Sequence, residues 1–233
     1  MKRSSTSSQG AGVRTARRAR GLTMGAVFMV GIAVAVLSGC SAQKEPAVYP
    51  DVEWQGSAPS GPLEQDPWVQ GVRAALEAEA VARNRNDFSL SEFKQSATGS
   101  YIDRQMGSAI EALASHHRTD LLPGPTPFLP TEVEEGAWGK GGDYAHVRGC
   151  YAMEWATESG TPPKDLVAHG REYRVERDSS GVIRVDSIAS LPDLDCEAVG
   201  SLPVALFDPA PEPSGVTEAY DVVRTDGTTS RTR

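Results

Sequence analysis

The sequence lacks the short motifs that identify several common enzyme classes. It contains no G-x-S-x-G nucleophile pattern, no glycine-rich phosphate loop and no H-E-x-x-H zinc pattern. Aromatic residues make up only 6% of the chain and all hydrophobic residues 39%, against 23 glycines and 16 prolines. This composition predicts one small hydrophobic core with a considerable length of chain outside it.

Acidic residues are missing from the first 39 positions, which carry six basic residues. Positions 40–233 therefore hold 17 basic and 31 acidic residues, a net charge of −14 against −8 for the whole chain. Nucleic-acid phosphates need a basic surface, so this balance excludes a nucleic-acid partner. It favours a self-repelling soluble module or a partner with a basic face.

Charged residues are absent from positions 21–39, which form an apolar run after the basic amino terminus. A positive region followed by an apolar region is the layout of an export signal. As a helix, these 19 residues would span roughly 28 Å, close to the thickness of a bilayer core. A retained membrane helix is therefore the alternative to a cleaved signal peptide at 1–39.

The apolar run ends at Leu37-Ser38-Gly39-Cys40, before a polar stretch. This tetrapeptide resembles the lipobox of bacterial lipoproteins. The resemblance implies that the Cys40 thiol receives a diacylglycerol and that a signal peptidase cuts just before Cys40. Small Ser38 and Gly39 leave room at the scissile bond, and Leu37 fills an apolar subsite. Two acyl chains hold a protein on a membrane where one holds weakly, so we expect a lipid anchor on the extracytoplasmic face of the cell membrane.

The basic amino terminus bears on the export route. Arg17-Arg18 is a pair of the kind found in twin-arginine signals. That pattern places an apolar residue two positions after the second arginine, and here the position is Arg20. The departure favours general secretion, with twin-arginine export as the alternative.

Composition divides the rest of the chain into three parts. Residues 40–65 contain Pro, Ser and Gly without a sustained period, which predicts a lipid-anchored flexible tether with Trp54 as a lone exposed aromatic residue. Residues 66–200 carry the periodic pattern of a folded domain. Residues 201–233 return to Pro, Gly, Thr and Asp, which predicts a disordered carboxyl-terminal tail.

The folded part begins with a helical pattern. Asp66 is a good N-cap and Pro67 suits the first helical position. Ser89 and Glu92 then match an S-x-x-E capping box, and the flanking phenylalanines match a hydrophobic staple. The three helices predicted from these signals and from the apolar period cover about 67–84, 90–96 and 100–116.

After the proline-rich segment 121–130 the hydrophobic period changes to two. Two hairpins follow, one with a predicted glycine-rich loop at 139–142 and one closed around 178–181. The predicted fold is α+β, with about three amino-terminal helices packed on a curved antiparallel sheet of about four strands. This order of elements resembles the nuclear transport factor 2-like superfold, including SnoaL-like polyketide cyclases, and also cystatin-like sheets.

Two cysteines, Cys150 and Cys196, remain if Cys40 carries lipid. Paired thiols of exported proteins form disulfides. The wide spacing and the lack of a C-x-x-C motif favour a structural bridge over a redox or metal-binding pair. Closing a loop of this length stabilises a fold by about 4 kcal/mol in the chain-entropy model.

The resemblance to the superfold implies a pocket inside the curved sheet, where an Asp or a His acts as general base and a Tyr or a protonated acid stabilises an oxyanion. The residues available for such a pocket are Asp103, Tyr144, His146 and His169. Asp103 follows a core position, so we expect it to point away from the core. His116 and His117 lie about 100° apart on a helix and have no third ligand, so no metal site is predicted.

The sequence therefore predicts no catalytic residue, no cofactor and no metal, and it leaves two functions open. The first is a non-enzymatic envelope lipoprotein whose domain binds a partner protein or a small ligand. The second is a small pocket enzyme of the isomerase, cyclase or hydrolase kind, which needs a deep apolar pocket with a convergent ionisable pair. The anchor, the acidic body and the missing motifs favour the first.

Overall fold

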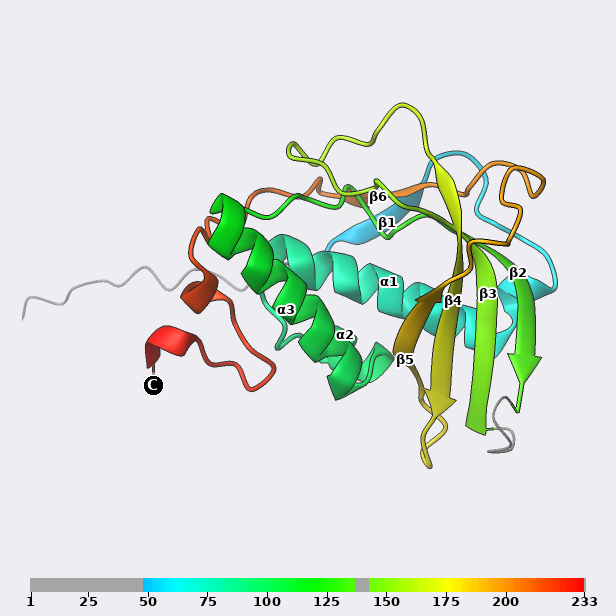
Figure 1. Ribbon diagram of the computed structural model, residues 1–233, viewed down its shortest axis with the longest axis horizontal. Helices are drawn as coiled ribbons and strands as arrows, with labels where there is room; N and C mark the ends of the chain where they lie inside the picture. Colours follow the sequence, from blue (N-terminus) through cyan, green and yellow to red (C-terminus); the bar gives the residue numbers. More distant parts are fainter. Residues whose placement is uncertain (1–47, 137–142, 233) are drawn as a thin grey trace, which may run out of the picture. The chain divides into compact units, whose positions relative to one another are not determined.

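Within residues 48–136 and 143–232, which the computed structural model describes, three α-helices lie against one face of a four-stranded antiparallel sheet (Figure 1). The helices are α1 (Pro67–Arg85), α2 (Ser91–Ser96) and α3 (Gly99–His116). The sheet has the order β2 (Phe128–Glu135), β3 (Tyr144–Ala152), β4 (Ala168–Arg177) and β5 (Ile183–Ser190). The predicted α+β class is confirmed.

A second, two-stranded sheet joins segments from opposite ends of the described chain. Its strands are β1 (Asp51–Trp54) and β6 (Ala205–Asp208), which pair antiparallel. Three short 3-10 helices complete the described elements: η1 (Leu63–Gln65), η4 (Ala219–Asp221) and η5 (Ser230–Thr232). Described residues before 66 and after 200 therefore belong to the folded unit.

This second sheet corrects the predicted boundaries at 66 and 200. The predicted tether at 40–65 contains β1, and the predicted tail at 201–233 contains β6 and the buried core residue Val222. Trp54, predicted to be exposed, is half-buried, and the Arg73 guanidinium lies over its ring at 5.6 Å. Strands of four residues are too short to show a period, and the surrounding Pro and Gly dominate the composition.

Of the two predicted helix start signals, the N-cap at Asp66 is confirmed and the capping box at Ser89 is wrong. The Asp66 side chain caps α1 by accepting a hydrogen bond from the Trp68 N–H at 2.8 Å, as predicted. The capping box at Ser89 does not form. Instead, the Ser89 N–H and hydroxyl both donate to Asp87 Oδ1, at 2.9 and 2.6 Å. Helix α2 begins two residues later, at Ser91. A carboxylate two residues away is the stronger acceptor, so it takes both donors.

The core has two parts, and α1 contributes to both. One part fills the space between the helices and the four-stranded sheet, and its large side chains include Trp68, Phe93, Phe128 and Tyr173. The other joins α1 to β6 and to the segments between the strands, and it includes Val81, Leu122, Trp155 and Phe207. Because α1 packs on both parts, 11 of its 19 residues are buried.

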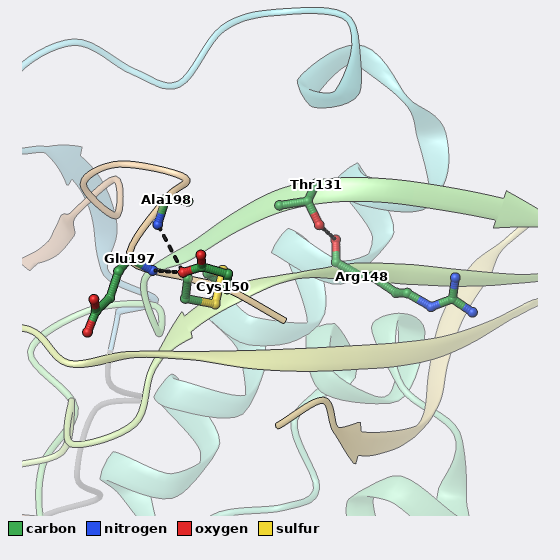
Figure 2. The surroundings of a disulfide bond; sticks show 7 residues. Thr131, Arg148, Cys150, Glu197 and Ala198 are labelled. Carbon is green, nitrogen blue, oxygen red and sulfur yellow. Dashed lines mark hydrogen bonds between the residues drawn. A yellow bond between two sulfur atoms is a disulfide. The ribbon is translucent and has the colours of Figure 1, made fainter. Parts of the chain in front are cut away.

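The predicted disulfide between Cys150 and Cys196 is present, with the two Cα atoms 5.7 Å apart. It fixes the segment after β5 to strand β3, an inner strand of the sheet (Figure 2). In that segment the Glu197 and Ala198 N–H groups both donate to Asp195 Oδ1 at 3.2 Å. Gly170 lies opposite Cys150 on β4, and a side chain there would come within 2.2 Å of the Leu191 carbonyl. The close approach of this segment therefore needs glycine at 170.

Other predictions fall on residues that the structure does not describe. These are the signal peptide at 1–39, the tetrapeptide ending at Cys40 and the glycine-rich loop at 139–142. Among the described residues, no helix is both long enough and apolar enough to cross a membrane.

We predict that the variant Cys150→Ser/Cys196→Ser unfolds with a free energy about 4 kcal/mol lower than that of the wild type, because the open chain gains the entropy of a 46-residue loop. Guanidinium unfolding followed by tryptophan fluorescence measures this difference. Reduced wild-type protein is the control and should match the double variant. An unchanged unfolding midpoint would show that the bridge contributes nothing.

Candidate functional site

The residues predicted for a pocket do not converge. Asp103 is exposed on α3, and His169 is exposed on β4. Tyr144 and His146 share one face of β3, while the alternating Ala145 and Val147 face the helices and are buried. Tyr144 and His146 therefore point away from the space in which a pocket was expected. His116 and His117 are exposed at the end of α3.

The space between the helices and the sheet is filled by side chains. Trp68, Phe93 and Phe128 are fully buried there. A hollow of about 50 Å³ lies elsewhere, beside β1 and α1, where Arg73 and Glu77 contribute to its lining. Sites for small molecules usually have volumes of about 300–1,000 Å³, so this hollow does not hold a substrate of ordinary size.

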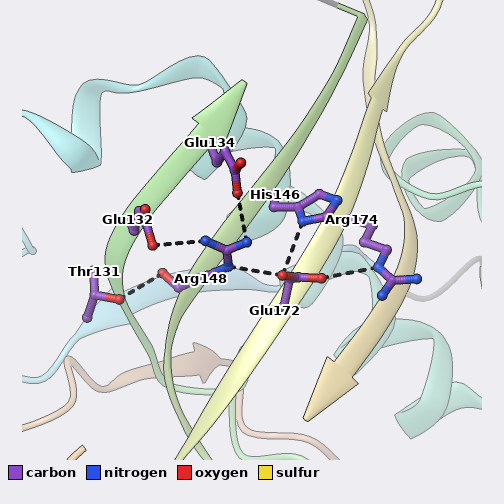
Figure 3. Close-up of polar contacts among 7 residues, drawn as sticks. All are labelled: Thr131, Glu132, Glu134, His146, Arg148, Glu172 and Arg174. Carbon is purple, nitrogen blue, oxygen red and sulfur yellow. Dashed lines mark hydrogen bonds and ion pairs between the residues drawn. The ribbon is translucent and has the colours of Figure 1, made fainter. Parts of the chain in front are cut away.

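The outer face of the sheet, the face away from the helices, carries an ionic network (Figure 3). Its centre is Glu172 on β4, whose side chain is only 8% exposed. Arg148 Nε donates to Glu172 Oε2 at 3.0 Å, and Arg174 Nε donates to Glu172 Oε1 at 3.1 Å. His146 Nδ1 lies 3.1 Å from Glu172 Oε2. One carboxylate thus gathers three basic side chains from two strands.

Arg148 extends this network to the edge strand β2. Its Nη1 donates to Glu132 at 3.0 Å and its Nη2 to Glu134 at 2.8 Å. The side chains of Glu132 and Glu134 are 57% and 52% exposed. One guanidinium therefore fixes three carboxylates, two of which present their remaining lone pairs to solvent. We call the group Glu132, Glu134, His146, Arg148, Glu172 and Arg174 the outer-face network.

The antiparallel register places these residues together. Arg148 lies opposite Glu132 on β2 and opposite Glu172 on β4. His146, two residues earlier and on the same face, lies opposite Glu134 and Arg174. Since side chains alternate between faces along a strand, one register sets every member of the network.

Electrostatics hold the network in its ionised form. Burial acts to raise the pKa of Glu172, but hydrogen bonds from Arg148 and Arg174 and the nearby His146 outweigh it and lower the pKa. The hydrogen bonds to Glu172 and Glu132 raise the pKa of Arg148 in turn. The face can therefore present fixed negative charge to a partner. Among the described residues no group of three His, Cys, Asp or Glu side chains is placed to hold a metal ion.

The core also contains polar residues that the sequence reasoning missed. The Tyr101 hydroxyl donates to Glu79 Oε2 at 2.6 Å, and both residues are buried. Burial, and next the charge of Glu79, raises the pKa of Tyr101. A signal was available, because Glu79 falls three residues after Leu76 and seven after Val72, on the apolar stripe of α1.

Comparisons with known proteins add little. No protein-family model matches the sequence, and no curated protein matches it. Among solved structures, the crystal structure of the intermembrane space region of the chloroplast protein ARC6 is similar over 58% of this chain and 100% of that chain. Its TM-score is 0.34 with 14% sequence identity, which is too low to indicate a shared fold or function.

We predict that Glu172→Gln lowers the free energy of unfolding by about 2 kcal/mol at neutral pH, because two arginines lose a buried charged acceptor. The pKa of Glu172 is lower in the folded state, so its contribution is complete above the unfolded-state pKa of about 4.3 and is lost as the pH falls through the folded-state pKa. The difference between variant and wild type should therefore shrink below about pH 4.

Denaturant unfolding at a series of pH values measures this difference. Glu132→Gln is the matched control, because it removes a mostly exposed carboxylate from the same guanidinium and should cost less than about 1 kcal/mol. Equal losses in the two variants would contradict the central position of Glu172.

Proposed function

We propose that this chain is a cell-envelope lipoprotein whose extracytoplasmic α+β domain is a non-enzymatic interaction module, with the outer face of the four-stranded sheet as its binding surface. The observation that carries the proposal is the outer-face network. It holds exposed carboxylates in fixed positions on a rigid sheet. Side chains that are ordered before binding lose less conformational entropy when a partner arrives.

The location rests on the amino terminus and is supported by the disulfide. Leu37-Ser38-Gly39-Cys40 follows a basic region and an apolar run, the order expected for a lipid-anchored exported protein. A disulfide such as Cys150–Cys196 forms and persists in oxidising compartments outside the cytoplasm. Membrane attachment through two acyl chains at Cys40 is consistent with both features.

The partner we propose is an envelope protein with a basic face. The outer face of the sheet carries four glutamates, including Glu176 on β4, against three arginines, Arg148, Arg174 and Arg184, the last of which lies opposite Glu176. Positions 40–233 as a whole have a net charge of −14. Complementary potentials speed the encounter of two proteins and reject partners of the wrong charge.

The alternative of a small pocket enzyme has less support. An enzyme of this kind requires a pocket lined by Asp103 or His146. These two residues lie apart, Asp103 on α3 and His146 on the outer face of β3. The large side chains Trp68, Phe93 and Phe128 fill the space beneath the sheet.

The anchor has a direct test at Cys40. We predict that the mature protein begins at Cys40 and that this residue carries a diacylglycerol, which intact mass spectrometry of the purified membrane form detects. Cys40→Ser should leave an unprocessed chain, because the thiol that accepts the lipid is gone. Ser41→Ala is the control and should be processed normally. An unmodified Cys40 still joined to Gly39 would overturn the anchor and restore the spanning helix.

The binding surface has a separate test. We predict that Glu132→Lys/Glu134→Lys abolishes capture of the partner from detergent-solubilised envelopes, because the surface charge changes by four units at the two most exposed acids of the network. Asp103→Lys/Glu111→Lys makes the same charge change on exposed positions of α3 and is the matched control. Quantitative mass spectrometry of the captured proteins compares the two. Equal capture by both variants would show that the partner does not use the outer face.

A further inference from the structure

The four-stranded sheet has two edge strands, β5 and β2, and their outer edges differ (Figure 1). The edge of β5 is covered, because the Thr98 N–H donates to the Val185 carbonyl at 2.9 Å. Arg104 Nη2 of α3 donates to the Asp186 carbonyl at 2.6 Å. The amino-terminal end of α3 therefore occupies the position beside β5 that a fifth strand would take.

The edge of β2 is closed over its first half. Arg73 Nη2 donates to the Phe128 carbonyl at 3.2 Å, and Glu64 of η1 binds the same guanidinium. Pro130 has no N–H, and β2 has one extra residue in its pairing with β3 between Pro130 and Glu132. An added strand can therefore pair only with the second half of β2, beyond Glu132.

In that second half, main-chain groups face outward without a further strand. The Gly136 N–H donates to the Tyr144 carbonyl of β3 at 2.8 Å. Because hydrogen-bonded pairs alternate along an antiparallel ladder, the N–H and carbonyl groups of Val133 and Glu135 point away from β3. Within residues 48–136 and 143–232, no other backbone segment is hydrogen-bonded to these groups.

The side chains around these main-chain groups are mostly acidic. Glu132, Glu134 and Glu135 are exposed, and Val133 is half-buried against the core. Glu132 and Glu134 share one guanidinium, that of Arg148, so negative charge remains at the edge. Two β2 strands of separate copies would bring like charges together, which destabilises a strand pair. The edge thus rejects a second copy of itself and favours a strand of opposite charge.

We propose that β2 takes up an extended segment of the partner protein as an added strand, beyond Glu132. In strand addition, main-chain hydrogen bonds give affinity and alternate side chains give specificity. The segment that fits has lysine or arginine side chains beside Glu132 and Glu134 on the outer face. Its intervening side chains are β-branched or apolar and lie beside Val133.

This proposal rests on the proposed function, because it gives the way in which a basic partner uses the outer face. It adds a requirement that charge alone does not make. The partner segment must be extended and must present free N–H groups along one side. The carboxylates of Glu132 and Glu134 and the outward main chain of Val133 lie on consecutive residues, so one strand can meet both.

The probe is a blocked, fluorescently labelled eight-residue peptide in which lysine and threonine alternate, titrated against the full chain in a non-ionic detergent. Two further peptides carry backbone N-methyl groups, one on every lysine and the other on every threonine. In an added strand only one of these two sets of amides faces β2, whichever way the strand runs. Fluorescence anisotropy should show one methylated peptide binding like the parent. The other should bind at least about tenfold more weakly, because it lacks the main-chain donors.

Two protein variants test the charge of the edge. Glu132→Gln/Glu134→Gln should weaken binding of the parent peptide about tenfold, because two charge pairs with the peptide are lost. Asp103→Asn/Glu111→Gln removes the same charge from exposed positions of α3 and is the matched control. It should bind the parent peptide as the wild type does.

Hydrogen exchange followed by NMR locates the bound peptide, which should slow exchange of the Val133 and Glu135 N–H groups. Equal affinities of the two methylated peptides, with the loss in Glu132→Gln/Glu134→Gln retained, would overturn strand addition and leave the charged outer face as the binding surface. Equal binding by the two protein variants would overturn strand addition and count against the outer face as well. Unchanged exchange at both amides, or no binding of the parent peptide, would also overturn the added strand.

Discussion

The antiparallel register between β3 and β4 is the constraint on which both faces of the sheet depend. Nine residue pairs, from Tyr144–Glu176 to Ala152–Ala168, set it. Outward, it places Arg148 opposite Glu172 and Cys150 opposite Gly170. Inward, it places Tyr151 beside the strand that carries Arg171. A slip by one residue would move the buried side chains to solvent and the charged ones into the core.

How much of the fold can be predicted from the sequence depends on the length of each sequence pattern. α1 and α3 extend over 19 and 18 residues, so their apolar period is clear, and the Asp66–Pro67 start is correct. β1 and β6 have four residues each and meet only in the folded chain, about 150 positions apart. A capping box is a local pattern, and at Ser89 a competing carboxylate two residues away prevented it. Short elements and competing local partners are therefore where sequence reasoning fails.

The candidate site shows the same limit. The pairing of Cys150 with Cys196 was predicted and is present, but His146, offered for a pocket, lies on the face opposite the buried Ala145 and Val147. The central residue, Glu172, was not found, because nothing near it in sequence shows which strand will lie alongside it. Its partner Arg148 is 24 positions away and is brought close only by the register. Pairing between strands that are distant in the sequence therefore brings the members of the network together.

The outer-face network in turn helps to select that register. A slip by two residues keeps the apolar side chains inside, so the hydrophobic pattern alone does not prevent it. In one direction the slip would place Arg148 opposite Arg174, a pair of like charges that destabilises a sheet. In the other direction Arg148 would face Gly170, and Glu172 would lose the arginine opposite it while remaining largely buried. The desolvation of Glu172 is therefore offset by well-placed donors only in the native pairing. The ionic surface that we propose as a binding face thus also distinguishes the native sheet from its nearest alternatives.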